Sequence, residues 1–129
     1  MKIRKALEKD LESVEKLFHI KELAAVDNWY PNKNVLKNFL KNNFFFVAEE
    51  ENKVLGAILG EPLKFGVMGW WFAVKENVRR KGIGTRLLKA FEEGARKEKK
   101  HFVIMHSHVK SKAIDFYLKN GYRKGQDVS

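Results

Sequence analysis

The sequence predicts an α/β fold, a mixed sandwich in which helices flank a mostly antiparallel, twisted sheet. Segments with the apolar pattern of strands are interspersed with segments whose apolar residues recur at helical spacing. Three of the strand patterns follow one another with only short turns between them, which favours an antiparallel meander. A chain of 129 residues, 44% of them hydrophobic, suits one domain with a real core. We therefore expect a single domain over residues 1–129.

The first part of the chain is predicted to hold a strand, two helices and a second strand. MKIRKA, residues 1–6, has the pattern of a short strand, and Asp10 is a candidate N-cap for the helix that follows. Pro31 interrupts the helical pattern before a second, shorter helix. NFFFVAEE, residues 43–50, is predicted to be a strand. The apolar faces of the two helices are Leu11, Val14, Leu17 and Phe18 in the first, and Val35, Leu36, Phe39 and Leu40 in the second.

The middle of the chain is predicted to complete the meander. VLGAILGEPL, residues 54–63, and FGVMGWWFAV, residues 65–74, are two further strand patterns. Side chains alternate between the two faces of a strand, so Trp70 and Phe72 are expected on one face and Trp71 on the other. At least one of the two tryptophans is expected to pack in the core.

The last part of the chain is predicted to be helix, strand and helix. The clearest amphipathic pattern begins near Ile83, and its apolar face also holds Leu87, Leu88, Phe91 and Ala95. HFVIMHSH, residues 101–108, is predicted to be a strand. Ser111 is a candidate cap for the last helix, and Gly121 is placed to end it.

Composition narrows the class of protein. Lys and Arg number 26 against 16 Asp and Glu, so the formal net charge is +10, which favours an anionic partner. The absence of cysteine excludes disulfides, thiolate metal sites and a cysteine nucleophile. No apolar run approaches the roughly 18 residues of a membrane span, and the first ten residues do not resemble a signal peptide. We therefore expect a cytoplasmic protein that does not enter a membrane.

One short stretch, VRRKGIG, points to a phosphate-bearing ligand. It lies between a predicted strand and a predicted helix, where free backbone N–H groups and the helix dipole attract anions. Leu87 stands where a dinucleotide fingerprint needs its third glycine, and no P-loop pattern occurs. What remains is the spacing R-x-x-G-x-G. The cations and glycines of the stretch are Arg79, Arg80, Lys81, Gly82 and Gly84.

On these residues the chain resembles the GCN5-related N-acetyltransferase (GNAT) family. VKENVRRKGIG is similar to the acetyl-CoA motif of that family, and FFFVAEEENKVLGAILG is similar to its second and third strands. AIDFYLKNGY resembles its last helix, with Tyr117, Lys119, Gly121 and Tyr122 in the typical places. The resemblance covers almost the whole chain.

The resemblance implies an acetyl-CoA-dependent N-acetyltransferase with a GNAT-like fold. It implies that the end of the fourth strand holds the pantetheine arm, that the R-x-x-G-x-G loop cradles the pyrophosphate, and that Tyr117 protonates the departing thiolate. Tyr117 could instead simply pack in the core. No metal is expected. The implied cofactor-binding residues are Phe72, Ala73, Val74, Arg79, Arg80, Lys81, Gly82, Ile83, Gly84, Thr85 and Ser111.

The amine acceptor and the general base stay open at this point. The acceptor is expected to be a primary amine of a small molecule or a protein, and residues 29–31 are expected to wall its site. Glu49, Glu61, a histidine or a chain of waters could take the amine proton. His106 and His108 are predicted on one strand face, and without a third ligand they make a poor zinc site.

Two further expectations concern partners and alternative functions. Ser129 lies seven residues after Tyr122, so the last strand pair usual in the family does not fit, and we expect a homodimer in which a partner chain could supply that edge. A non-catalytic module that senses acyl-CoA is the first alternative function. A basic nucleic-acid-binding protein is the second, suggested by charge alone, although no aromatic–basic RNA motif occurs.

Overall fold

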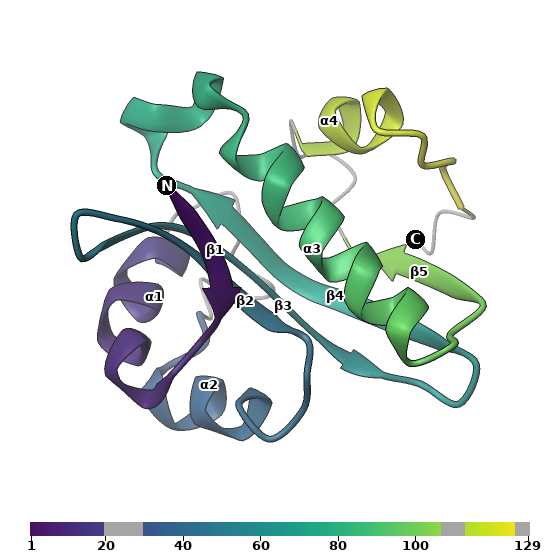
Figure 1. Ribbon diagram of the computed structural model, residues 1–129, viewed down its shortest axis with the longest axis horizontal. Helices are drawn as coiled ribbons and strands as arrows, with labels where there is room; N and C mark the ends of the chain where they lie inside the picture. Colours follow the sequence, from purple (N-terminus) through teal and green to yellow (C-terminus); the bar gives the residue numbers. More distant parts are fainter. Residues whose placement is uncertain (20–29, 107–112, 126–129) are drawn as a thin grey trace.

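The computed structural model describes residues 1–19, 30–106 and 113–125 (Figure 1). Within them, every predicted strand and helix is present, and two short 3-10 helices are added. In chain order the elements are β1 (Lys2–Lys5), the 3-10 helix η1 (Glu8–Asp10), α1 (Leu11–Phe18), α2 (Lys33–Phe39), β2 (Phe45–Glu50), β3 (Lys53–Pro62), β4 (Gly66–Val74), the 3-10 helix η3 (Glu76–Lys81), α3 (Ile83–Lys97), β5 (Phe102–Met105) and α4 (Ala113–Lys119).

The five strands form one sheet in the order β1-β2-β3-β4-β5. The first four strands pair antiparallel with their neighbours, whereas β5 runs parallel to β4. The parallel pairing follows from the crossover through α3, which returns the chain to the end of the sheet where β4 began. The prediction of a mostly antiparallel sheet is confirmed.

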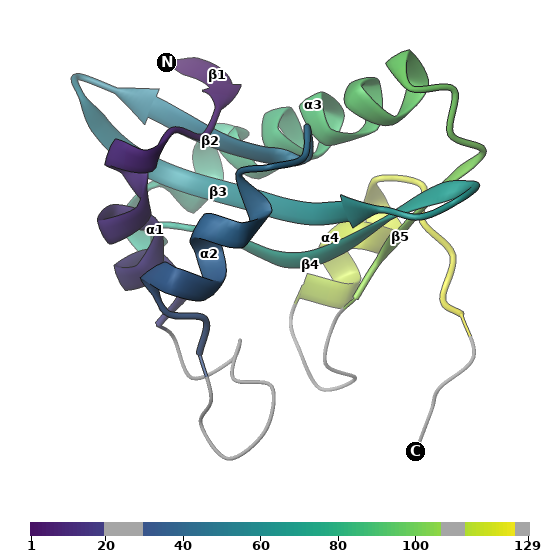
Figure 2. The ribbon, with the colours of Figure 1, turned by 90° about the horizontal axis from the view of Figure 1, so that it is seen from below.

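Helices cover both faces of this sheet. Figure 2 shows α3 along one side, with α1 and α2 on the opposite side. The alternation along β2 and β3 divides the apolar side chains between two clusters. The α1–α2 cluster includes Leu11, Phe18, Leu36, Phe45, Val47 and Leu59, and the α3 cluster includes Phe44, Ile58, Ile83, Leu87, Leu88 and Phe91.

A β-bulge in β4 overturns the prediction for the tryptophans. Leu59 of β3 pairs with Trp71 and Gly60 pairs with Gly69, so Trp70 is an extra residue in the ladder. Trp70 and Trp71 therefore both pack against the α1–α2 cluster, and Phe72 packs against the α3 cluster. The expectation that Trp70 and Phe72 share a face was wrong, because the bulge shifts the alternation by one residue.

Asp10 lies at the N-cap position of α1, as predicted, but its carboxylate does not cap that helix. Instead it accepts hydrogen bonds from Nη1 and Nη2 of Arg4, at 2.8 and 2.9 Å, and from the backbone N–H of Leu7 at 2.7 Å. The carboxylate therefore holds β1 and the turn before α1 together. Its side chain is almost fully buried in doing so.

The fifth strand is shorter than predicted. It ends at Met105, and His106 follows it, whereas residues 107 and 108 lie outside the described residues, as does Ser111. Gly66 and Gly69 of β4 make room for this strand, because a side chain at either would collide with Phe102 or Met105. No helix in the described part of the chain is long and apolar enough to cross a membrane.

Candidate functional site

The predicted anion-binding stretch lies at the junction between β4 and α3. β4 ends at Val74, the chain turns through η3, and α3 begins at Ile83, as predicted. The connection expected to be a loop is a 3-10 helix over Glu76–Lys81. The structure describes the backbone of Arg79, Arg80 and Lys81 but not their side chains.

Gly82 sets the geometry of this junction. Its backbone is left-handed, with φ 74° and ψ 12°, a conformation that favours glycine. No side chain caps α3, and no acidic residue lies in its first turn, so the dipole at this end is not offset within the helix. A Cβ built on Gly82 would meet nothing within 4 Å. The start of α3 therefore faces open space on the side where Gly82 lacks a side chain.

Gly84, unlike Gly82, is closely surrounded by other side chains. A Cβ there would lie 3.3 Å from Cζ of Phe116 and 3.5 Å from Cζ of Phe72. The missing side chain thus lets α4 and β4 pack closely against the first turn of α3. The sequence suggested anion approach for this glycine, and the structure adds a packing reason that the spacing alone did not reveal.

The pairing between β4 and β5 ends before β4 reaches this junction. Their ladder ends at Gly69 and Met105, and the N–H of His106 donates to the carbonyl of Gly69 at 2.8 Å. β4 itself continues to Val74, well past the end of β5 (Figure 1). The strip over Phe72–Val74, expected to hold the pantetheine arm, lies in this extension.

Tyr117 of α4 lies close to the same extension. Its side chain is buried, and its ring centroid lies 6.1 Å from that of Phe72 and 5.7 Å from that of Phe116. Burial raises the pKa of its phenol well above the ordinary value, so the hydroxyl stays protonated at neutral pH. Among the hydrogen bonds of the described residues, none involves this hydroxyl.

Tyr122 supports α4 from the other end. Its hydroxyl donates to Oε2 of Glu92 on α3 at 2.8 Å, and its N–H donates to the carbonyl of Tyr117 at 3.0 Å. Burial, and then the bond to Glu92, raise the pKa of the Tyr122 phenol. The sequence marked Tyr122 only as the aromatic after the last helix. Its hydrogen-bond partner Glu92 lies thirty residues earlier, so the residues near Tyr122 could not predict the bond.

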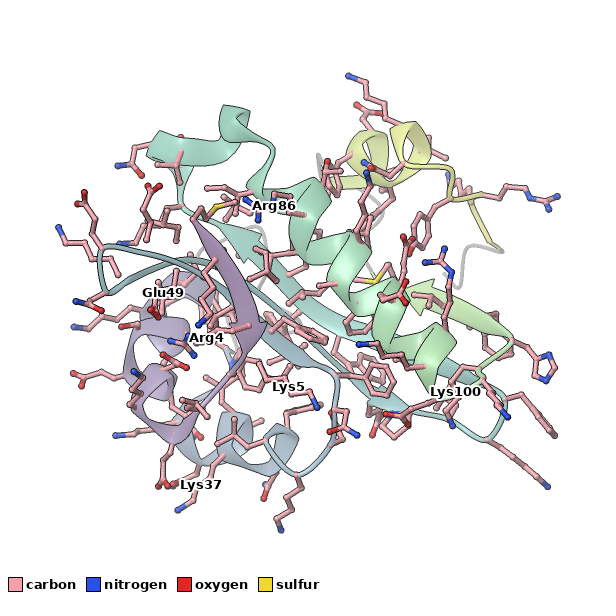
Figure 3. The ribbon with its side chains drawn as sticks, in the orientation of Figure 1. Arg4, Lys5, Lys37, Glu49, Arg86 and Lys100 are labelled. Atoms are coloured by element: carbon pink, nitrogen blue, oxygen red, sulfur yellow. The ribbon has the colours of Figure 1, made fainter. Side chains whose placement is uncertain are left out.

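The structure separates the candidates for a general base. Glu49 lies on β2, and its carboxylate forms an ion pair with Arg4 at 2.9 Å (Figure 3). In the sheet, β2 is separated from β5 by β3 and β4. Glu61 accepts a hydrogen bond from Nε1 of Trp70 at 2.8 Å. His106 is exposed, and its ring lies 5.4 Å from that of Trp70. Glu61, Trp70 and His106 thus form one cluster near the point where β4 and β5 part, and Glu49 does not belong to it.

Of residues 29–31, predicted to wall the acceptor site, two are described. Residue 29 lies outside the described part, Pro31 is buried, and the ring of Tyr30 lies 4.1 Å from that of His19.

One cation near the junction was not singled out as a site residue in the sequence. Arg86 is exposed and lies in the first turn of α3 (Figure 3). Over residues 1–19, 30–106 and 113–125, no group of three or more acidic or histidine side chains could hold a metal ion.

Comparison with known proteins gives three matches of interest. A family model described as an acetyltransferase (GNAT) domain matches residues 41–124. An uncharacterized N-acetyltransferase, MJ1530, of Methanocaldococcus jannaschii is 34% identical over 132 residues, which cover 95% of this chain and 78% of that protein. The S-(2-succino)cysteine N-acetyltransferase of Bacillus subtilis is 35% identical over 103 residues, 71% of this chain and 62% of that enzyme.

A solved structure matches the fold over nearly the whole chain. The crystal structure of Ard1 from Thermoplasma volcanium superposes with a TM-score of 0.83 at 26% identity, covering 97% of this chain and 84% of that one. The sheet and its helices are therefore those of a known architecture.

Proposed function

The chain belongs to the GNAT acetyltransferase family, and on that premise we propose that it transfers an acetyl group from acetyl-CoA to a primary amine. One observation carries the proposal. The left-handed Gly82 opens the uncapped start of α3 to an anion, directly beside the stretch of β4 that continues past β5. An anion site next to an extended strand suits a ligand that joins a pyrophosphate to a long amide-bearing arm.

The residues at the junction fit such a ligand. The backbone N–H groups of residues 79–84 would hold the pyrophosphate, since the first N–H groups of a helix lack partners within it. Arg86 would add a nearby positive charge to those of residues 79–81. The strip Phe72–Val74 would take the amide-bearing arm as an added strand, and Thr85 would lie beside the phosphates. When bound there, acetyl-CoA supplies the activated acetyl group.

Tyr117 is proposed as the general acid. The amine nitrogen forms a bond to the acetyl carbonyl carbon, and the carbon–sulfur bond breaks. The sulfur leaves as a thiolate, and Tyr117 gives it the proton of its phenol. The phenol is protonated at neutral pH, as a proton donor must be, and because burial raises its pKa it is a weak acid whose help to the thiolate is modest. The rings of Phe72 and Phe116 pack around the buried ring of Tyr117.

His106 is proposed as the group that takes the proton from the attacking amine. It follows the last residue of β5, and its backbone N–H holds it to Gly69 at the end of the β4–β5 ladder. Its ring rests against Trp70, whose indole N–H is in turn fixed by Glu61. Glu49 is a poorer candidate, because Arg4 already occupies its carboxylate.

The acceptor is proposed to be a primary amine of a small molecule or of a protein. One relative, by its name, acetylates S-(2-succino)cysteine, and this chain spans 62% of that enzyme. We propose that the acceptor amine approaches from the side of the Glu61–Trp70–His106 cluster, opposite the start of α3.

An acetylation assay tests the proposal. Acetyl-CoA is mixed with the purified 129-residue protein and with amines from four groups: amino acids, polyamines, aminoglycosides and peptides with a free N-terminus or lysine. Release of the CoA thiol is followed over time. Thiol release that depends on one class of amine supports the proposal. Tight acetyl-CoA binding without release in any group would instead indicate a sensing module.

A further inference from the structure

Strands β3, β4 and β5 place a row of side chains on the sheet face that packs against α1 and α2. Glu61 of β3 pairs with Met68 of β4, and Met68 pairs with Ile104 of β5. Paired residues share a face of the sheet, and Glu61 shares its face with Leu59 of the α1–α2 cluster. Met68 and Ile104 belong to neither core cluster, and Ile104 is 44% exposed. The row is therefore an accessible apolar floor with a carboxylate at one end.

The indole of Trp70 joins this row to the proposed base. Its Nε1–H donates to Oε1 of Glu61 at 2.8 Å, and its ring centroid lies 5.4 Å from that of His106. Trp70 is half-buried and packs against the α1–α2 cluster, which holds the ring in place. A carboxylate, an aromatic ring and an imidazole thus follow one another across the surface where the acceptor is proposed to approach.

The negative charge of Glu61 has no cationic partner within the part of the chain that the structure describes. Its carboxylate is exposed, and the indole N–H contacts only Oε1. Two cations at the turn between β3 and β4 have other partners. Nζ of Lys64 lies 5.4 Å from the ring centroid of Phe65, and Nζ of Lys100 donates to the carbonyl of Leu63 at 2.7 Å. Oε2 of Glu61 is therefore placed to accept a cation from outside the chain.

We propose that Glu61 and Trp70 bind a second positive charge on the acceptor, so that the preferred substrate is an aliphatic diamine. This inference rests on the proposed acetyl transfer. The reacting amine would lie at His106, and the carbon chain would cross Met68 and Ile104. The second ammonium group would lie against the indole, within reach of Oε2 of Glu61. The ring face attracts a cation, and the carboxylate forms a charge-assisted hydrogen bond with it.

The overall charge of the protein opposes such an acceptor, so the preference has to be local. With a net charge of +10, the protein repels a dication more strongly than a monocation. A carboxylate beside an aromatic ring offsets this repulsion at one point only. Loss of the Glu61 charge should therefore affect a diamine more than a monoamine with the same carbon chain.

Kinetics with cadaverine and pentylamine test the proposal, because the two amines share one carbon chain and differ in the second ammonium group. In the wild type, kcat/KM for cadaverine should exceed that for pentylamine about tenfold, as an exposed ion pair and a cation–π contact together allow. Glu61→Gln should remove most of this preference, since its amide oxygen can still accept the indole N–H. Trp70→Leu should also reduce it. Glu12→Gln is the control, because it removes one charge from a 72% exposed side chain on α1 and should keep the preference.

Calorimetric titration of both amines into the protein saturated with CoA measures recognition without turnover. Cadaverine should bind the wild type about tenfold more tightly than pentylamine and lose this advantage in Glu61→Gln. That result without any acetyl transfer would remove the proposed function and leave the assignment of Glu61 standing. Equal binding of the two amines to the wild type would overturn the assignment. So would a variant Glu61→Gln that lowers kcat/KM for both amines by the same factor.

Discussion

Arg4 and Asp10 form a two-pronged ion pair, with Nη1 to Oδ2 at 2.8 Å and Nη2 to Oδ1 at 2.9 Å. The same guanidinium also reaches Glu49, so one cation serves two carboxylates from two elements. Arg4 comes from β1, Asp10 precedes α1, and Glu49 lies on β2. This cluster therefore holds the first helix against the first edge of the sheet.

The first prediction concerns acid stability. Burial alone would raise the pKa of Asp10, but hydrogen bonds from Arg4 and from the Leu7 N–H outweigh burial and hold that pKa below its ordinary value. The unfolded chain therefore binds the proton first, so the free energy of unfolding should fall as the pH drops below about 4. Asp10→Asn should lower stability at pH 7 by about 2 kcal/mol and flatten this acid dependence.

Chemical denaturation at several pH values measures this effect. Glu12→Gln provides the control, because Glu12 is 72% exposed and its contact with Lys16 is 3.9 Å long. That variant should keep the acid dependence of the wild type. If Asp10→Asn also keeps it, the ion pair does not govern acid stability.

The second prediction compares two glycines. Gly82 and Gly121 both have positive φ, at 74° and 91°, and a Cβ on either would meet nothing within 4 Å. Alanine at either position should therefore cost about 1–2 kcal/mol of stability. Only Gly82→Ala should also weaken acetyl-CoA binding, by at least about tenfold or 1.4 kcal/mol. Calorimetry on both variants decides, and equal affinities would remove Gly82 from the proposed cofactor site.

The third prediction concerns which part of the cofactor is recognised. Acetyl-CoA at a hundredfold excess over its Kd should stabilise the native state by about 2.7 kcal/mol and raise the Tm accordingly. Pantetheine lacks the pyrophosphate that the start of α3 is proposed to hold, so it should raise the Tm much less. Thermal melts with matched ligand concentrations measure the difference. Equal shifts would mean that the junction at Gly82 does not bind the phosphates.

The fourth prediction separates two phenols. Tyr117→Phe should lower kcat and kcat/KM together by about 10–100-fold, because the proton matters in the transition state and a thiolate leaves fairly readily without it. Acetyl-CoA affinity and stability should change little. Tyr122→Phe should show the reverse, with stability reduced by about 1–2 kcal/mol through loss of the bond to Glu92 and kcat nearly intact.

Steady-state kinetics and denaturation of both variants check this pair of outcomes. An unchanged kcat for Tyr117→Phe, where chemistry limits the rate, would leave Tyr117 as a packing residue. A large loss of acetyl-CoA affinity would make it a cofactor ligand instead.

The fifth prediction concerns the proposed base. His106→Gln should lower kcat/KM by about 100-fold and leave acetyl-CoA affinity nearly unchanged. His101→Gln is the matched control, because His101 is exposed at the other end of β5 and contacts only Phe65 among the described ring pairs. Steady-state kinetics and acetyl-CoA titrations of both variants distinguish a base from a structural residue. An unchanged kcat/KM in His106→Gln would return the choice to Glu61 or to water.

Most of the fold could be predicted because its signals are local. The apolar face from Ile83 to Ala95 lies within one helix, and the alternation along residues 45–50 lies within one strand. The start of α3 followed in the same way from its apolar pattern, whereas the left-handed backbone of Gly82 was not predicted. These features depend on neighbours within a few residues, and the sequence shows those neighbours directly.

The features that could not be predicted depend on distant partners. The bulge at Trp70 depends on how β4 pairs with Gly60 of β3, and the residues of β4 alone do not indicate it. Asp10 was expected to cap its own helix, but the competing cation comes from β1. The packing role of Gly84 depends on Phe116, which lies on another helix. Each of these needs the sheet or the helix pairing to exist first.

The extra residue at Trp70 lets β4 present two adjacent indoles to the same side of the sheet. Deleting Trp70 would leave Trp71 opposite Leu59 and Phe72 opposite Ile58, so the two strands would pair regularly. Phe72 would keep its place beside Gly84 and Phe116. The strand would lose only the Trp70 ring, and with it the contact with His106 and the hydrogen bond to Glu61. The bulge therefore serves the Glu61–Trp70–His106 cluster and is not needed for the packing of α3.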